Sequence, residues 1–172
     1  MADRADFDAY VRARWTPLLR TAMLLTADRH AAEDLVQETL VKAASHWHRV
    51  DPATADAYVR RILFTRSVDA WRWRRRQPDP VEPGSADGPV AGDASTGVDS
   101  RLTLAQALGR LTPRQRAVLV LRYYEDRSEA ETARVLDCSV GTVKSQTNYA
   151  LGRLRTLAPE LAATFGREEI PR

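Results

Sequence analysis

Residues 128–154 read SEAETARVLDCSVGTVKSQTNYALGRL, and this stretch decides the fold of the C-terminal part of the chain. Ser128, followed three residues later by Glu131, has the form of a capping box, which predicts that a helix begins here. Ser139 is a favoured residue immediately before a helix and predicts a second helix start. Asp137 lies in the turn between the two helices, where it tolerates a positive φ. A short helix, a tight turn and a longer helix make up the helix-turn-helix geometry.

The longer helix is expected to end before Pro159, because the residue preceding a proline disfavours helical geometry. Its apolar residues recur at helical spacing and should face inward. In the shorter helix, Ala133 is small enough to lie where the two helices cross. The residues expected to face inward from the longer helix are Val143, Ala150, Leu151 and Leu154.

The outward face of the longer helix is polar and nearly free of acidic residues, which suits duplex DNA. A DNA-binding helix-turn-helix presents the N-terminal side chains of its second helix to the major groove. Lys144 and Arg153 suit phosphates, while Gln146 and Asn148 can pair with base edges. A three-helix packing unit that binds no DNA shows the same apolar spacing and is the alternative. The candidate DNA-binding residues are Thr142, Lys144, Ser145, Gln146, Asn148, Tyr149 and Arg153.

Two further helices are expected just upstream of this unit. Thr112 and Gln115 form another capping box, with Pro113 at the first helical position. The helix that begins there carries the apolar residues Ala117, Val118, Leu119, Leu121 and Tyr124. A shorter helix is expected before it, from about residue 102 to residue 111.

The first 76 residues show the helical period of 3.6 residues. Apolar residues follow this period from Phe7 to Leu25, and Pro17 predicts either a kink or a restart of that helix. A second helix is expected from about residue 28 or 29 to Trp47. A third helix should extend from about residue 54 to residue 76.

The third helix contains seven arginines, with two tryptophans interleaved near its end. Basic side chains bind phosphates and exposed aromatic planes stack on bases, so this composition suits a surface for single-stranded nucleic acid. A solvated run of charge with tryptophans in the core is the alternative, and the helix alone does not decide between the two. The candidate residues are Arg60, Arg61, Thr65, Arg66, Asp69, Trp71, Arg72, Trp73, Arg74, Arg75 and Arg76.

Charge divides the 172-residue chain into three parts, although its formal net charge is only +3. Residues 1–76 carry 14 basic and 10 acidic side chains, and residues 101–172 carry 12 and 8. Residues 77–100 carry five acidic side chains, no basic ones, four prolines and four glycines, which predicts a flexible linker. We therefore expect an all-α protein with two small helical domains, 1–76 and 101–172, joined by this acidic linker.

Composition excludes several classes of protein. A single cysteine, Cys138, excludes a disulfide framework and a cysteine-rich zinc site. The N-terminus lacks the apolar segment of a signal peptide, and no run of about 18 apolar residues occurs. We expect a cytoplasmic protein that needs no metal, cofactor, membrane or small-molecule substrate.

With both blocks taken together, the chain resembles a bacterial RNA polymerase sigma factor of the extracytoplasmic-function (ECF) class, in particular a subgroup common in high-GC actinobacteria. Residues 32–40 (AEDLVQETL) resemble region 2.2, and residues 58–76 resemble regions 2.3 and 2.4. Residues 139–145 (SVGTVKS) resemble the recognition helix of region 4.2. The sequence departs from the family pattern at Thr65, where Asn is frequent, and at Gln146, where a long basic residue is frequent.

The resemblance implies a sigma factor that directs promoter-specific initiation, and a role for each block. Region 2.2 would bind core RNA polymerase at the β′ clamp helices through Asp34, Gln37 and Glu38, which share one helix face by their spacing. Regions 2.3 and 2.4 would capture and melt the minus-10 element of the promoter. Region 4.2 would read the minus-35 element as duplex, with its domain on the β flap. The resemblance also allows an anti-sigma factor as a partner.

Two other functions remain in competition. The first is a stand-alone helix-turn-helix regulator with a helical sensing domain, which would have no reason to carry the region 2.2-like face. The second is a nucleic-acid enzyme that uses the carboxylates of residues 33, 34 and 38 together with a histidine. His46 and His48 are two residues apart and would point to different sides of a helix, which disfavours that function.

Overall fold

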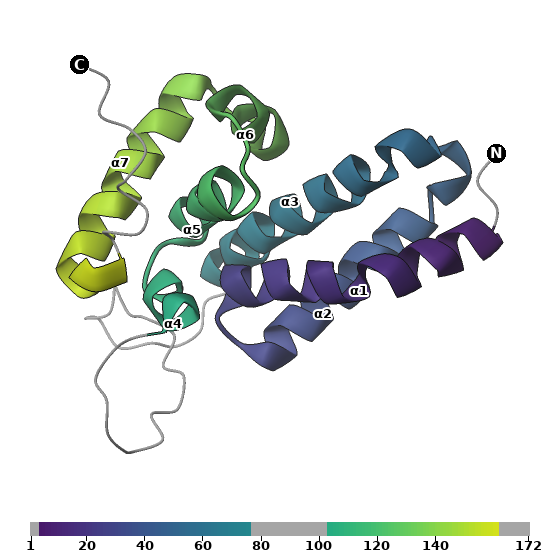
Figure 1. Cartoon of the computed structure of the whole chain (residues 1–172), viewed down its shortest axis with the longest axis horizontal. Helices are drawn as coiled ribbons and strands as arrows, with labels where there is room; N and C mark the ends of the chain where they lie inside the picture. Colours follow the sequence, from purple (N-terminus) through teal and green to yellow (C-terminus); the bar gives the residue numbers. More distant parts are fainter. Residues whose placement is uncertain (1–3, 77–102, 162–172) are drawn as a thin grey trace.

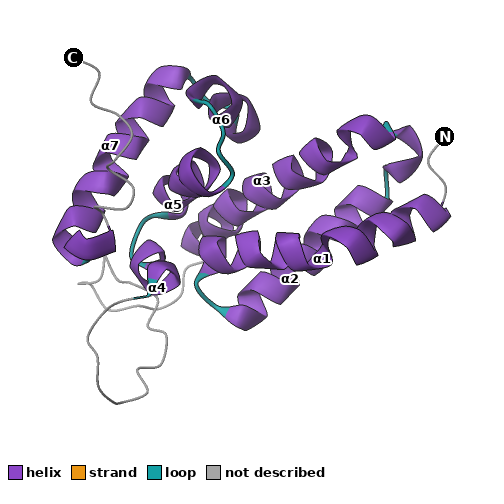
Figure 2. Ribbon diagram, viewed as in Figure 1, coloured by secondary structure: helices purple, strands orange, loops and turns teal. Residues whose placement is uncertain are grey.

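The computed structural model describes residues 4–76 and 103–161. All regular structure in these two ranges is helical, which confirms the predicted all-α class (Figures 1 and 2). The N-terminal part consists of α1 (Arg4–Thr26), α2 (Arg29–Ala44), the short helices η1 (Trp47–Arg49) and η2 (Pro52–Thr54), and α3 (Ala55–Arg76). The C-terminal part consists of α4 (Leu104–Gly109), α5 (Pro113–Leu119), the wide turn η3 (Val120–Tyr124), α6 (Glu129–Leu136) and α7 (Val140–Leu157).

The helices α1, α2 and α3 pack side by side in the N-terminal half (Figure 1). Helix α1 continues through Pro17 without a restart. Asp28 caps α2 by accepting a hydrogen bond from the backbone N–H of Ala31 at 2.7 Å. Helix α2 ends at Ala44, before the predicted end at Trp47. Trp47 falls in η1 instead, where it is buried against the rings of Phe7 and Tyr10.

Helix starts in the C-terminal half are those that the capping residues predict. Thr112 and Ser128 both form complete capping boxes, and Ser139 caps α7 by accepting from the N–H of Thr142. Asp137 has the expected positive φ, at 49°. Helix α7 ends at Leu157, ahead of Pro159. The helix-turn-helix is thus formed by α6 and α7, as the sequence predicts.

A small cluster of its own holds the helix-turn-helix together. Val118 of α5, Ala133 of α6 and Val143 of α7 are all buried in it. Ala133 therefore lies at the helix crossing, as expected. The predicted helix from Pro113 to Tyr124 is different in one respect: its last turn widens, so that the N–H of Glu125 donates to the carbonyl of Val120.

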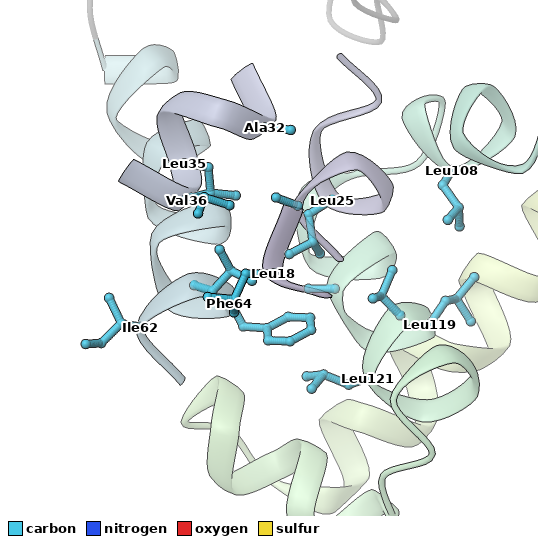
Figure 3. Packing of buried hydrophobic residues seen from close by; sticks show 14 of the residues in the cluster. Leu18, Leu25, Ala32, Leu35, Val36, Ile62, Phe64, Leu108, Leu119 and Leu121 are labelled. Carbon is cyan, nitrogen blue, oxygen red and sulfur yellow. The ribbon is translucent and has the colours of Figure 1, made fainter. Parts of the chain in front are cut away.

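The two halves share one hydrophobic core. Helix α4 packs on α1, and α5 and α6 pack on α3. Figure 3 shows Phe64 of α3 pointing toward Leu121 of the C-terminal half, close to Leu18 of α1. Phe64 is fully buried and Leu121 is 2% exposed. The predicted linker, residues 77–100, lies outside the described residues, so the domain boundaries remain predictions.

Candidate protein and nucleic-acid interfaces

Helix α2 separates a buried stripe from a polar one. Leu35, Val36 and Leu40 are buried against the rest of the N-terminal half, whereas Asp34, Gln37 and Glu38 are exposed. The exposed residues occupy neighbouring positions on one helix face, since residues three and four apart are adjacent there. This face is therefore open to a partner.

Val41 extends this face by one turn and was missed by sequence reasoning. It is 72% exposed, although its neighbours Leu40 and Ala43 are buried. Single exposed apolar residues are common on protein surfaces, so what matters about Val41 is its place on the same face as Asp34, Gln37 and Glu38. The signal was present in the sequence, because residues 34, 37, 38 and 41 follow the i, i+3, i+4, i+7 spacing.

Glu38 also contacts the predicted nucleic-acid surface on α3. An Nη1 atom of Arg66 donates to Oε2 of Glu38 at 3.1 Å, and the Glu38 side chain stays 60% exposed. The two predicted surfaces therefore meet at this ion pair. Its exposure keeps its contribution to stability small, of the order of 0.5 kcal/mol.

The predicted single-strand surface follows α3 from Arg60 to its end. Arg61 and Thr65 are exposed on successive turns, and the Thr65 hydroxyl donates to the carbonyl of Arg61 at 2.7 Å. Asp69 is exposed one turn further on. Residues 71–76 continue the helix, but the side chains of Trp71, Arg72, Trp73, Arg74, Arg75 and Arg76 lie outside those that the structure describes.

Arg60 differs from the neighbouring Arg61, which is exposed, because it is held inside the molecule. Its Nε donates to Asp56 at 2.7 Å, and its Nη1 pairs with Glu125 of the C-terminal half. Only 17% of its side chain is exposed. Burial lowers the pKa of Arg60, but the hydrogen bond with Asp56 and the charges of Glu125 and Asp56 outweigh burial and raise it above the ordinary value.

Helix α7 presents most of its predicted DNA-binding residues to solvent. Lys144, Ser145, Asn148, Tyr149 and Arg153 are exposed, and Thr142 and Gln146 are half-buried. The Nζ atom of Lys144 lies 3.6 Å from a carboxylate oxygen of Glu129, the first residue of α6. The opposite face of α7 is buried through Val143, Ala150 and Leu154.

Arg116 is a buried charge that sequence reasoning missed. It is 8% exposed and donates to the backbone carbonyls of Leu108, Gly109 and Leu111 around the end of α4, and to that of Leu25 in α1. Burial lowers its pKa to about 10, so it keeps its charge at neutral pH. The only sign of this burial in the sequence was that position 116 falls, by helical spacing, on the inner face of the helix that begins at Pro113.

Comparison with known protein families matches both halves. Residues 8–77 match the model for sigma-70 region 2, and residues 107–156 match the model for sigma-70, region 4. The RNA polymerase sigma-E factor of Streptomyces coelicolor is 39% identical over 156 residues, covering 90% of this chain and 87% of that protein. The chain belongs to the ECF family of RNA polymerase sigma factors.

A second relative is the ECF RNA polymerase sigma factor SigL of Mycobacterium tuberculosis, which is 33% identical over 94% of this chain and 91% of that protein. Among solved structures, the sigma factor RpoE of Bartonella quintana, in complex with the anti-sigma factor NepR, is similar with a TM-score of 0.66. That likeness has 27% identity and covers 88% of this chain and 96% of RpoE.

As a member of this family, the protein binds core RNA polymerase and promoter DNA and directs promoter-specific transcription initiation. Sigma factors are not enzymes in themselves. Within residues 4–76 and 103–161, no helix combines the length and apolar character needed to cross a membrane. The same ranges contain no group of three or more His, Cys, Asp or Glu placed to hold a metal.

Proposed function

We propose that the exposed face of α2, defined by Asp34, Gln37, Glu38 and Val41, is the surface that docks on the β′ clamp helices of core RNA polymerase. The observation that carries this proposal is the exposure of three polar residues and one large apolar residue on a single helix face. Acidic groups beside an apolar residue suit a partner helix with basic and apolar side chains.

We further propose that α3 captures the minus-10 element as a single strand. Arg61 and Arg66 would neutralise phosphates, and Thr65 and Asp69 would contact bases exposed by melting. The stretch 71–76 would extend this surface through stacking on Trp71 and Trp73. Departure from the family pattern at Thr65 predicts a base preference that differs from relatives with Asn at this position.

We propose that α7 reads the minus-35 element in the major groove while its domain sits on the β flap. Lys144 and Arg153 would contact phosphates, and Gln146 and Asn148 would contact base edges. Thr142, Ser145 and Tyr149 complete that surface. Because one polymerase holds both halves, a contact by the first raises the effective concentration of the second.

On this proposal the chain supplies binding energy and no catalytic group, since the polymerase carries out the chemistry. Residues 77–100 would act as a tether between domains 1–76 and 101–172, and the protein would work in the cytoplasm with the polymerase. An anti-sigma factor is a further proposed partner, supported by the similar RpoE structure, which contains one.

Charge reversal on α2 tests the proposal. Asp34→Arg with Glu38→Arg should abolish binding to core polymerase and run-off transcription while leaving the helical content unchanged, because both side chains are exposed. Asp8→Arg with Glu160→Arg is the matched control, with the same change of charge at two exposed positions elsewhere. Unchanged core binding by the α2 variant would refute this assignment, and specific promoter binding without polymerase would favour the stand-alone regulator.

A further inference from the structure

Glu125 joins the two halves of the molecule. It follows the wide turn η3 in the C-terminal half, and only 8% of its side chain is exposed. One carboxylate oxygen accepts from the Thr21 hydroxyl of α1 at 2.8 Å, and the other pairs with Arg60 of α3. A carboxylate that is buried between two helices of the other half is a specific contact, because an unpaired charge there would carry a large desolvation penalty.

Two more contacts join the C-terminal half to the end of α1. Arg116 of α5 donates to the carbonyl of Leu25, in the last turn of α1, where helix carbonyls lack partners within the helix. Close by, Gly109 of α4 lies against Ala27, and a Cβ atom at Gly109 would be 2.8 Å from the Cβ atom of Ala27. Together with the shared core around Phe64 and Leu121, these contacts define what we call the closed arrangement.

The closed arrangement is too short to engage both promoter elements. Helix α7 packs on α5 and α5 packs on α3, so the axes of α7 and α3 are separated by two packing distances, about 20 Å. Adding half the length of α3 and half that of α7, about 17 Å and about 14 Å at 1.5 Å per residue, places the centres of these two helices at most about 50 Å apart. Elements centred near minus-35 and minus-10 lie about 25 base pairs apart, which is about 85 Å of straight duplex at 3.4 Å per base pair.

The halves must therefore separate when the promoter is bound. The chain between Arg76 and Thr103 contains 26 residues, and a chain of that length can span up to about 90 Å when fully extended. Separation removes Glu125 from Arg60 and leaves the guanidinium beside Asp56 alone. It also exposes Arg60 on the same helix as Arg61, within the proposed minus-10 surface.

We propose that Glu125 competes with promoter phosphate for Arg60, so that the closed arrangement masks one phosphate contact of the minus-10 surface until the halves separate. A guanidinium binds a carboxylate and a phosphate through the same planar fork of donors, which makes the two partners mutually exclusive. The proposal rests on the assignment of α3 to single-stranded promoter DNA.

Distance measurement on the free full-length chain tests the closed arrangement. Spin labels at Ala44→Cys and Thr156→Cys, both exposed positions, are introduced in a Cys138→Ser background. The chain with Glu125 intact should give mainly one short interspin distance. Glu125→Gln should shift population to longer distances, and Glu160→Gln, the control with the same change of charge, should not.

Binding of a fluorescein-labelled oligothymidine strand, without polymerase, tests the competition itself. Glu125→Gln should raise the affinity several-fold over the parent chain and over Glu160→Gln. Adding Arg60→Ala to Glu125→Gln should remove that gain. Gly109→Val provides a second route, because it should open the halves by steric conflict with Ala27 while both charges stay in place.

Three results would contradict the proposal. Unchanged distances in both Glu125→Gln and Gly109→Val would show that these contacts do not hold the halves together. Separation without a gain in oligothymidine binding, or a gain that survives Arg60→Ala, would show that Arg60 is not the masked contact. Failure of the parent chain to support run-off transcription with core polymerase would instead contradict the proposed function. The distance measurement does not depend on that result.

Discussion

Gly109 and Ala27 meet where the two halves pack against each other, so that a methyl group on Gly109 would lie 2.8 Å from the Cβ atom of Ala27. Ala27 follows the last residue of α1 and has a φ of 57°, in the left-handed region that favours glycine. The turn into α2 thus combines backbone strain at Ala27 with a contact that only glycine at position 109 allows.

Ala27→Gly should stabilise the protein, because glycine adopts this φ without the penalty of about 1–2 kcal/mol that a Cβ atom carries. The extra conformational freedom of glycine in the unfolded chain offsets part of that gain. We expect the free energy of unfolding in urea to rise by about 0.5–1 kcal/mol. Ala13→Gly, at an exposed interior position of α1, should lower it by about 1 kcal/mol. A loss of stability in Ala27→Gly would contradict the strain at this turn.

Val41→Ser should weaken binding to core polymerase while leaving the stability of the free chain nearly unchanged. Val41 is 72% exposed in the free chain, so it gains burial only if a partner covers it. Burying a valine side chain contributes about 1.5 kcal/mol, or roughly tenfold in the dissociation constant. Titration of labelled core polymerase measures the effect.

Leu40→Ser, on the buried side of the same helix, is the control and should instead unfold or strongly destabilise the chain. Equal core binding by Val41→Ser and the parent would show that Val41 is not part of the interface.

The helix starts could be predicted from sequence because each depends on a few neighbouring residues. Thr112, Ser128 and Ser139 cap their helices through side chains three residues apart, and Asp137 takes up its positive φ within a local turn. The exposed face of α2 was predictable for the same reason, since helical spacing determines which residues share a face.

The contact between the halves could not be predicted, because it depends on residues far apart in the chain. Glu125 and Thr21 are separated by 104 positions, and Arg116 reaches the carbonyl of Leu25 across 91. Nothing near Glu125 in the sequence distinguishes it from a solvated carboxylate. The same contact explains why Arg60, predicted from its helix as a surface arginine, is mostly buried in the closed arrangement.

Acid should weaken the start of α6 through Glu131. The backbone N–H and hydroxyl of Ser128 donate to its carboxylate at 2.9 and 2.7 Å, and these bonds together with Arg127 lower its pKa below the ordinary 4.5. Because the folded pKa lies below the unfolded one, this stabilisation is present above pH 4.5 and is lost as the pH falls through the folded value.

Glu131→Gln should therefore be less stable than the parent at neutral pH and should approach it in acid, as measured by urea unfolding at a series of pH values. The exposed Glu160→Gln is the matched control. A stability difference between Glu131→Gln and the parent that stays constant across that pH range would show that the carboxylate charge does not stabilise the capping box.

Lys144 and Gln146 lie two residues apart on α7 and should affect promoter binding in different ways. Lys144 is exposed and its Nζ atom lies 3.6 Å from a carboxylate oxygen of Glu129, so its ammonium can turn to a phosphate. Lys144→Ala should weaken binding of holoenzyme to all minus-35 sequences and reduce the slope of log K against log salt by about 1. Gln146→Ala should leave that slope unchanged and relax the preference at one base pair, by about 1–3 kcal/mol.

Fluorescence anisotropy on a set of singly substituted minus-35 duplexes, repeated over a range of salt concentrations, separates the two effects. If Gln146→Ala weakened every duplex equally, this side chain would be a backbone contact, and the base preference would have to come from Asn148 or its neighbours.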